Sequence, residues 1–168
     1  DAASTEPPEA VELLSFDEDP SPRASTDLLD FHTEPVERRP ALKLKEEGND
    51  LVRCKKFQDA IHCYEAAIAA LDIEGGIEQA LLSSLHANLA LCHLQLELYR
   101  RAQDAATRSL ELDPGNMKAL YRRCLAQKAL KMFPEAQADF HQLVSRGSDL
   151  TASDLQRLRQ GLQLPASA

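Results

Sequence analysis

The sequence predicts an all-α protein in which three helical hairpins stack on one another. The first observation is an alanine that follows an aromatic residue by three positions and recurs along the chain at a nearly regular spacing. The second is a set of turn signals, Pro134 and residues 113–116 (DPGN), which interrupt the helical stretches where a hairpin requires it. The three pairs are Phe57 and Ala60, Tyr99 and Ala102, and Phe133 and Ala136.

The N-terminal segment, residues 1–40, differs in composition from the rest of the chain. It contains eleven acidic and three basic residues and six of the nine prolines, with no helical apolar stripe. Such a segment buries too little apolar surface to offset its ordering entropy, so residues 1–40 are predicted to form a disordered acidic tail. Acids and bases balance over residues 41–168, which disfavours nucleic acid as a partner. No apolar run is long enough for a membrane span.

Two short acidic and apolar clusters interrupt the tail, LLSFD at residues 13–17 and DLLDF at residues 27–31. The first resembles a clathrin-box peptide, which suggests a second partner recruited through Leu13–Asp17. The alternative is a solubilising tail in which the second cluster packs loosely on the first helix. Both interpretations stay open at this point.

The repeat domain is expected over residues 41–163, and its elements follow from the repeat pattern. The spacing from Ala60 to Ala102 is longer than the spacing from Ala102 to Ala136, and the extra residues fall near residues 72–76. They are expected to lengthen the flanking helices or the loop without breaking the stack. The expected helices are 41–53, 58–71, 78–96, 100–112, 117–129, 134–145 and 154–160. They form repeats over about 41–74, 78–114 and 117–146, followed by a capping helix at about 153–161. Helix–turn–helix units with a period of about 34 residues, the spacing from Ala102 to Ala136, are typical of tetratricopeptide (TPR) repeats.

The last helix is predicted to cover the open end of the third repeat. Ser153 is placed to cap its start and Gly161 to close it. Leu155, Leu158 and Leu162 then form an apolar stripe, as the terminal unit of a repeat stack requires.

Helical geometry assigns a packing face and a groove face to the first helix of each repeat. When the recurring alanine is numbered 20, position 8 holds Gly48, Ala90 and Cys124, all small enough for close helix approach. At about 100° per residue, positions 4, 7, 8 and 11 share this packing face, and positions 2, 5, 6 and 9 lie opposite, on the concave side. His93 and Gln127 stand at position 11, so looser packing is expected there.

Polar side chains from all three repeats are predicted to converge on the concave face. There are five such side chains, and none of them is acidic. Lysine, arginine and asparagine all present hydrogen-bond donors, so together these side chains match an anionic ligand group. The candidate ligand-binding residues are Lys45, Asn49, Asn88, Lys118 and Arg122, with Leu91 and Leu125 as an apolar groove floor.

Three runs of sequence resemble the carboxylate-clamp TPR co-chaperone family: KEEGN at 45–49, NLALC at 88–92 and KALYRR at 118–123. The resemblance covers residues 41–146. It implies a right-handed superhelix that binds the C-terminal Glu-Glu-Val-Asp peptide of seventy- and ninety-kilodalton heat-shock chaperones. It also implies that the five candidate residues hold the two carboxylates of the terminal aspartate.

Other functions remain as alternatives. The basic groove would also suit an internal acidic segment of another protein, or the chain's own tail. An enzyme is disfavoured, because the sequence has no nucleophile–base arrangement, phosphate loop or metal-ligand spacing, and no cofactor is predicted. The four cysteines, at positions 54, 63, 92 and 124, form no CxxC pair, which favours a reducing, cytoplasmic compartment.

Overall fold

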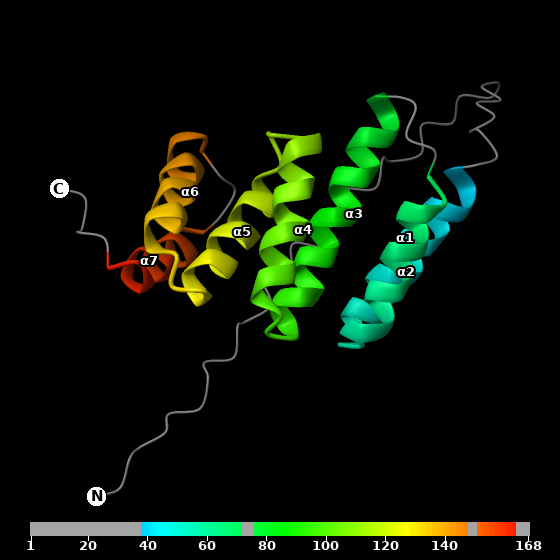
Figure 1. Ribbon diagram of the computed structural model, residues 1–168, viewed down its shortest axis with the longest axis horizontal. Helices are drawn as coiled ribbons and strands as arrows, with labels where there is room; N and C mark the ends of the chain where they lie inside the picture. Colours follow the sequence, from blue (N-terminus) through cyan, green and yellow to red (C-terminus); the bar gives the residue numbers. More distant parts are fainter. Residues whose placement is uncertain (1–37, 72–75, 148–150, 164–168) are drawn as a thin grey trace, which may run out of the picture. The chain divides into compact units, whose positions relative to one another are not determined.

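The structure is a computed structural model that describes residues 38–71, 76–147 and 151–163 (Figure 1). These ranges contain α-helices and no strand. The helices are α1 (Arg38–Arg53), α2 (Phe57–Ala69), α3 (Gly76–Gln95), α4 (Tyr99–Leu112), α5 (Met117–Ala129), α6 (Phe133–Ser145) and α7 (Ala152–Gly161). The predicted all-α class is therefore confirmed.

Successive helices pair as three antiparallel hairpins, α1 with α2, α3 with α4 and α5 with α6 (Figure 1). Neighbouring hairpins contact each other through α2 and α3 and through α4 and α5, and α3 also contacts α5 directly. The first helices of the second and third hairpins thus lie next to each other, and that arrangement brings the candidate residues of these two helices close together.

Small residues allow the helices of each hairpin to approach closely. A Cβ atom built on Gly48 would lie 2.5 Å from Cε1 of Tyr64, so any larger residue would displace the ring. The matching residues of the next two hairpins, Ala90 and Cys124, have no exposed surface. The recurring alanines that predicted the repeats are likewise fully buried: Ala60, Ala102 and Ala136.

Helices α1 and α3 both begin earlier than the sequence predicts. Helix α1 begins at Arg38, three residues before the expected start, with Pro40 inside its first turn. Proline is tolerated there because the first N–H groups of a helix have no intrahelical partner. Helix α3 begins at Gly76 and has 20 residues where α5 has 13, so part of the extra length in the first repeat spacing prolongs α3.

The last helix spans nearly the predicted range of about 153–161, but the predicted capping residues are wrong. Thr151, not Ser153, is the N-cap: its backbone is extended, and its Oγ1 accepts a hydrogen bond from the Asp154 N–H at 3.2 Å. The Thr151 hydroxyl also donates to the Asp154 carboxylate, and Ser153 lies inside the first turn of the helix. Gly161 is the last helical residue, and the left-handed residue that follows the helix is Gln163.

The predicted apolar stripe of α7 is confirmed. Leu158 and Leu162 are almost fully buried in one cluster with side chains of α5 and α6, and Leu155 is partly buried against it. The residues of α5 and α6 in that cluster are Leu120, Cys124, Ala136, Phe140 and Leu143. Helix α7 therefore covers the open end of the third hairpin.

A buried polar network fixes the third hairpin against the second. The hydroxyl of Ser83 on α3 donates to the Ser109 carbonyl at 2.9 Å, and the hydroxyl of Ser109 donates to the Ser83 carbonyl at 2.7 Å. Nδ2 of Asn116 donates to both hydroxyl oxygens, at 3.0 and 3.1 Å. The Oδ1 of Asn116 accepts from the Ala119 N–H at 3.1 Å and caps α5. One side chain thus sets both where α5 begins and its register against α3.

The two polar residues at position 11 are buried. His93 is 7% exposed and Gln127 is 5% exposed. Within the described ranges, Nδ1 of His93 and Oε1 of Gln127 have no hydrogen-bond partner. Unsatisfied polar atoms cost free energy when they are buried. The looser packing expected at position 11 stays a prediction.

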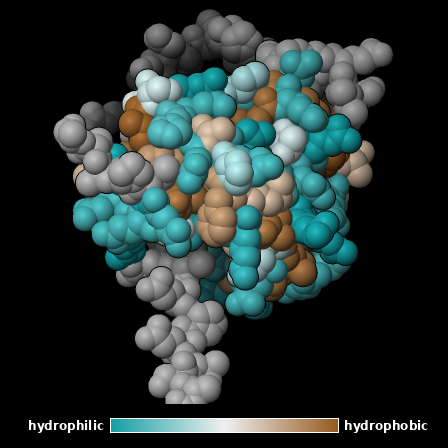
Figure 2. All heavy atoms as spheres, turned by 60° about the vertical axis from the view of Figure 1, so that its left-hand side comes forward, coloured by the Kyte–Doolittle hydropathy of each residue, from teal (hydrophilic) through white to brown (hydrophobic). Residues whose placement is uncertain are grey.

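Residues 1–37 lie outside the described ranges, so the predicted disorder of the tail and its clusters at 13–17 and 27–31 stay predictions. In the part of the chain that the structure describes, no helix is both long and apolar enough to cross a membrane. Figure 2 shows a face on which hydrophilic side chains predominate and apolar ones lie between them in separate patches. Large apolar residues with substantial exposure occur singly on α1, α6 and the α3–α4 turn: Leu42, Leu98, Phe133 and Val144.

Candidate functional site

Three of the five candidate residues form a hydrogen-bonded chain across the three hairpins. Asn88 on α3 donates through Nδ2 to Oδ1 of Asn49 on α1 at 3.1 Å. Arg122 on α5 donates through Nη1 to Oδ1 of Asn88 at 3.5 Å and to the Ala87 carbonyl at 2.8 Å. Residues 39 and 34 positions apart in sequence are therefore brought together by the stacking of the hairpins.

The two remaining candidates lie one helical turn from members of this chain. Lys45 precedes Asn49 by four residues on α1, and Lys118 precedes Arg122 by four residues on α5. Side chains four apart share a helix face, so each lysine is on the same side of its helix as its partner. Lys45 is half-buried and Lys118 is exposed. The same face also carries one acid, Glu46, which is exposed, so the face is not free of negative charge.

The predicted floor residues are half-buried at matching positions of α3 and α5. Leu91 packs against the core of the first two hairpins, and Leu125 packs against the core around α5. Each therefore leaves part of its side chain accessible, as a groove floor requires. Their contact with a ligand stays a prediction.

Adjacent arginines on α5 have opposite roles. Arg123 points toward α6, where its Nε and Nη2 donate to the two carboxylate oxygens of Asp139, both at 2.7 Å. The Asp139 side chain is 4% exposed, so this bidentate pair holds α5 against α6. Arg122 points instead toward α3, and that divergence places a guanidinium group beside Asn88.

Tyr64, a residue that the sequence did not predict as part of the site, extends the series of hydrogen bonds beyond Asn49. Tyr64 on α2 is 1% exposed, and its hydroxyl donates to Oδ1 of Asn49 at 2.8 Å. The available sequence signal is the hydroxyl itself, because a tyrosine in a core position needs a polar partner for it. Its position in the repeat otherwise indicates only a packed aromatic residue.

The orientation of these groups decides what the site offers a ligand. Oδ1 of Asn49 accepts two hydrogen bonds, and Oδ1 of Asn88 accepts one from Arg122. The amide acceptors are thus used inside the protein. Nδ2 of Asn49 donates to no acceptor among the described residues. The arrangement suits a ligand group that only accepts hydrogen bonds, such as a carboxylate.

The buried cysteines near the site have no nucleophilic character. Burial raises the pKa of the Cys92 thiol to about 12, although the nearby Arg122 charge acts in the opposite direction. Burial, followed by the Asp139 charge, raises the pKa of Cys124 to about 12 as well. Both groups are therefore neutral thiols at physiological pH. Among the described residues, no group of three or more His, Cys, Asp or Glu side chains is placed to hold a metal ion.

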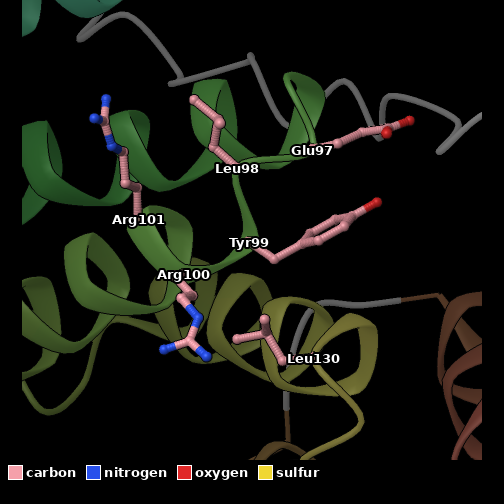
Figure 3. Close-up of a pocket in the computed structure, with 6 residues that line it drawn as sticks. All are labelled: Glu97, Leu98, Tyr99, Arg100, Arg101 and Leu130. Atoms are coloured by element: carbon pink, nitrogen blue, oxygen red, sulfur yellow. The ribbon is translucent and has the colours of Figure 1, made fainter.

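A shallow hollow of about 330 Å³ at the α3–α4 turn lies outside this set of residues. Figure 3 shows Glu97 and Tyr99 extending to one side of the turn and Arg100 lying beside Leu130. The six side chains point in different directions, so they do not gather donors onto one point as Asn49, Asn88 and Arg122 do. The lining residues are Glu97, Leu98, Tyr99, Arg100, Arg101 and Leu130.

Comparison with solved structures identifies the family. The second TPR domain of Spaghetti (RPAP3), bound to the HSP90 peptide SRMEEVD, superposes with a TM-score of 0.57 at 31% identity, over 64% of this chain and 92% of that domain. The chain belongs to the TPR co-chaperone family. The Hsp90 co-chaperone Cns1 from Saccharomyces cerevisiae gives a TM-score of 0.66 at 26% identity, over 77% of this chain and 40% of Cns1.

Two further comparisons extend the TPR co-chaperone assignment. The second TPR domain of human RPAP3, in complex with the HSP70 peptide SGPTIEEVD, has a TM-score of 0.59 at 29% identity, over 73% of this chain and 98% of that one. Human sperm-associated antigen 1 is 34% identical over 101 residues, or 60% of this chain. This chain spans only 10% of that relative's length. No model of a known protein family matches the chain.

Proposed function

We propose that this TPR protein is a non-catalytic co-chaperone adaptor whose groove binds the C-terminal Glu-Glu-Val-Asp peptide of seventy- and ninety-kilodalton heat-shock chaperones. The hydrogen-bonded chain from Asn49 through Asn88 to Arg122 is the observation that carries the proposal. The peptides SRMEEVD and SGPTIEEVD in the related TPR domains support it, since both end in the same four residues.

The proposed binding mode uses the five candidate residues together. Lys45, Asn49 and Asn88 receive one carboxylate of the terminal aspartate, while Lys118 and Arg122 receive the other carboxylate and the nearby backbone. Leu91 and Leu125 contact the apolar valine. Because α1, α3 and α5 are held in register by the protein's own contacts, binding orders little beyond the peptide itself.

The expected affinity is moderate and depends on salt. Each charge-assisted hydrogen bond contributes roughly 1.5–3 kcal/mol, and part of the total is offset by the cost of ordering the peptide. A Kd of about 1 μM, which corresponds to roughly −8 kcal/mol, fits such a site. Binding weakens with salt, because exposed charges are screened over about 8 Å at physiological ionic strength.

The alternative occupant is an internal acidic segment of another protein. A groove that reads acidic side chains alone would bind a peptide equally well with or without a free C-terminal carboxylate. The converging donors around Asn49 and Asn88 favour the free chain end, because they provide more donors than one side-chain carboxylate requires. We place this function in the cytoplasm, which the four free cysteines support.

Arg122→Ala tests the proposal directly. Calorimetric titration with a Glu-Glu-Val-Asp peptide should show binding at least about tenfold weaker than wild type, because one charge-assisted contact is lost. Arg108→Ala is the matched control, since Arg108 is an exposed arginine on α4 that pairs with Glu111 on the same helix. It should bind as wild type does. Equal affinities for Arg122→Ala and wild type would discard the groove assignment.

A further inference from the structure

Tyr64 is placed unusually for a residue that contacts the candidate site. It lies on α2, a second helix of a hairpin, whereas the five candidate residues lie on the first helices α1, α3 and α5. Its ring is 1% exposed and packs against Gly48, where an added Cβ would lie only 2.5 Å from Cε1. This contact leaves the ring no room to shift toward α1, so the hydroxyl is held at one point beside Asn49.

The Tyr64 hydroxyl contacts the side-chain amide of Asn49, whose orientation determines which side of it donates hydrogen bonds and which side accepts them. An asparagine amide presents an acceptor on one side and two donors on the other, and a half-turn of the amide exchanges them. Oδ1 of Asn49 accepts from the Tyr64 hydroxyl at 2.8 Å and from Nδ2 of Asn88 at 3.1 Å. Rotation of the amide would place its NH₂ group against the Asn88 NH₂ group, and two donors would then face each other.

We propose that Tyr64 is a positioning residue for carboxylate recognition: its hydroxyl, together with the Asn88 NH₂ group, holds the Asn49 amide with the acceptor inward and the donors toward the groove. With the amide so held, Asn49 donates to a carboxylate. With the amide rotated, its oxygen would repel one. This inference rests on the proposed function, because it explains how one of the ligand-binding groups acquires the correct polarity.

Tyr64→Phe isolates the hydroxyl, because it retains the ring that packs against Gly48. The Kd for a Glu-Glu-Val-Asp peptide, measured by calorimetry, should rise by about three- to tenfold, the scale of one lost hydrogen bond. The matched control is Tyr99→Phe, at a half-buried tyrosine on α4 that has no part in the chain of hydrogen bonds. Its Kd should equal that of wild type.

A second measurement needs no peptide and separates positioning from packing. In the nuclear Overhauser spectrum of the unliganded protein, the Asn49 side-chain NH₂ protons should show weak or no contacts with the ring at position 64. In Tyr64→Phe only the Asn88 hydrogen bond still holds the amide, so part of the population should rotate and bring those protons toward the ring, which would produce new contacts. A purely structural role of the hydroxyl would lower stability and leave this orientation unchanged.

The two measurements distinguish failure of the inference from failure of the proposed function. If Arg122→Ala weakens peptide binding but Tyr64→Phe does not, or if the Asn49 amide signals are the same in both proteins, the positioning role is overturned. If Arg122→Ala binds as wild type does, the proposed function fails. The amide signals of the unliganded protein then still decide whether Tyr64 orients Asn49.

Discussion

At the scale of single residues, His93 is a buried ionisable residue, and one of its ring nitrogens lacks a hydrogen-bond partner among the described residues. It is 7% exposed, and within the described ranges its Nδ1 makes no hydrogen bond. Burial lowers the pKa of His93, the Arg101 charge on α4 lowers it further, and Glu65 on α2 acts in the opposite direction. The His93 ring is therefore neutral near pH 7.

His93 should make the stability of the protein fall as the solution becomes acidic. Because its folded-state pKa lies below the unfolded value near 6.5, the unfolded chain binds more protons, and stability is lost as pH falls through that value. One histidine contributes a slope of at most about 1.4 kcal/mol per pH unit. His93→Gln, which copies the residue at the same position of the third repeat, should flatten the dependence between about pH 7 and pH 5.

Urea denaturation at several pH values provides the measurement for His93. Burial also lowers the pKa of His86, so some pH dependence should persist in the His93→Gln protein. His62→Gln replaces an exposed histidine on α2 and should follow the wild-type curve. A His93→Gln curve parallel to wild type would contradict the assignment of this proton uptake to His93.

At the scale of elements, the three hairpins use the same turn with a non-glycine residue in a left-handed conformation. Lys55, Glu97 and Lys131 have φ values of 58°, 58° and 61°. In the third hairpin the Met132 N–H donates to the Gln127 carbonyl at 2.9 Å and the Lys131 N–H donates to the Lys128 carbonyl at 3.0 Å. This is a Schellman arrangement, in which glycine is the residue most often found at the left-handed position.

Lys131→Gly should therefore stabilise the protein by about 0.5–1 kcal/mol, the left-handed strain relieved less the entropy that glycine adds to the unfolded chain. Lys131 is exposed, so its side chain contributes little packing. Urea denaturation followed by circular dichroism gives the free energy of unfolding. Lys131→Ala is the control, because it retains the Cβ and should show no gain. A destabilised Lys131→Gly protein would mean that the lysine side chain stabilises the turn by more than the strain it imposes.

The sequence predicted the hairpins well and the details of their ends less well, for physical reasons. Buried alanines at a fixed period are a local and repeated requirement of close helix packing, so Ala60, Ala102 and Ala136 identify the hairpins. The cap of α7 was misplaced because Thr151 and Ser153 have the same capping chemistry, and only the course of the backbone decides between them. Tyr64 was missed because its hydrogen bond joins α2 to α1 and depends on how the two helices pack.

At the scale of the whole helical unit, the site exists only because separate contacts set the hairpins in register. Gly48 allows α1 and α2 to approach, and the Ser83, Ser109 and Asn116 network fixes α5 against α3. These contacts bring Asn49, Asn88 and Arg122 within hydrogen-bonding distance. The unit therefore presents one preformed cluster of donors built from three repeats.

This cluster of donors is proposed to recognise a free chain end. The most direct measurement compares the Kd values of two Glu-Glu-Val-Asp peptides, one with a free C-terminal carboxylate and one with a C-terminal amide, by calorimetry at a single salt concentration. The amide removes one of the two carboxylates at the terminal aspartate, so its binding should be at least about tenfold weaker. Equal affinities for the two peptides would contradict the claim and would favour a groove that reads internal acidic side chains.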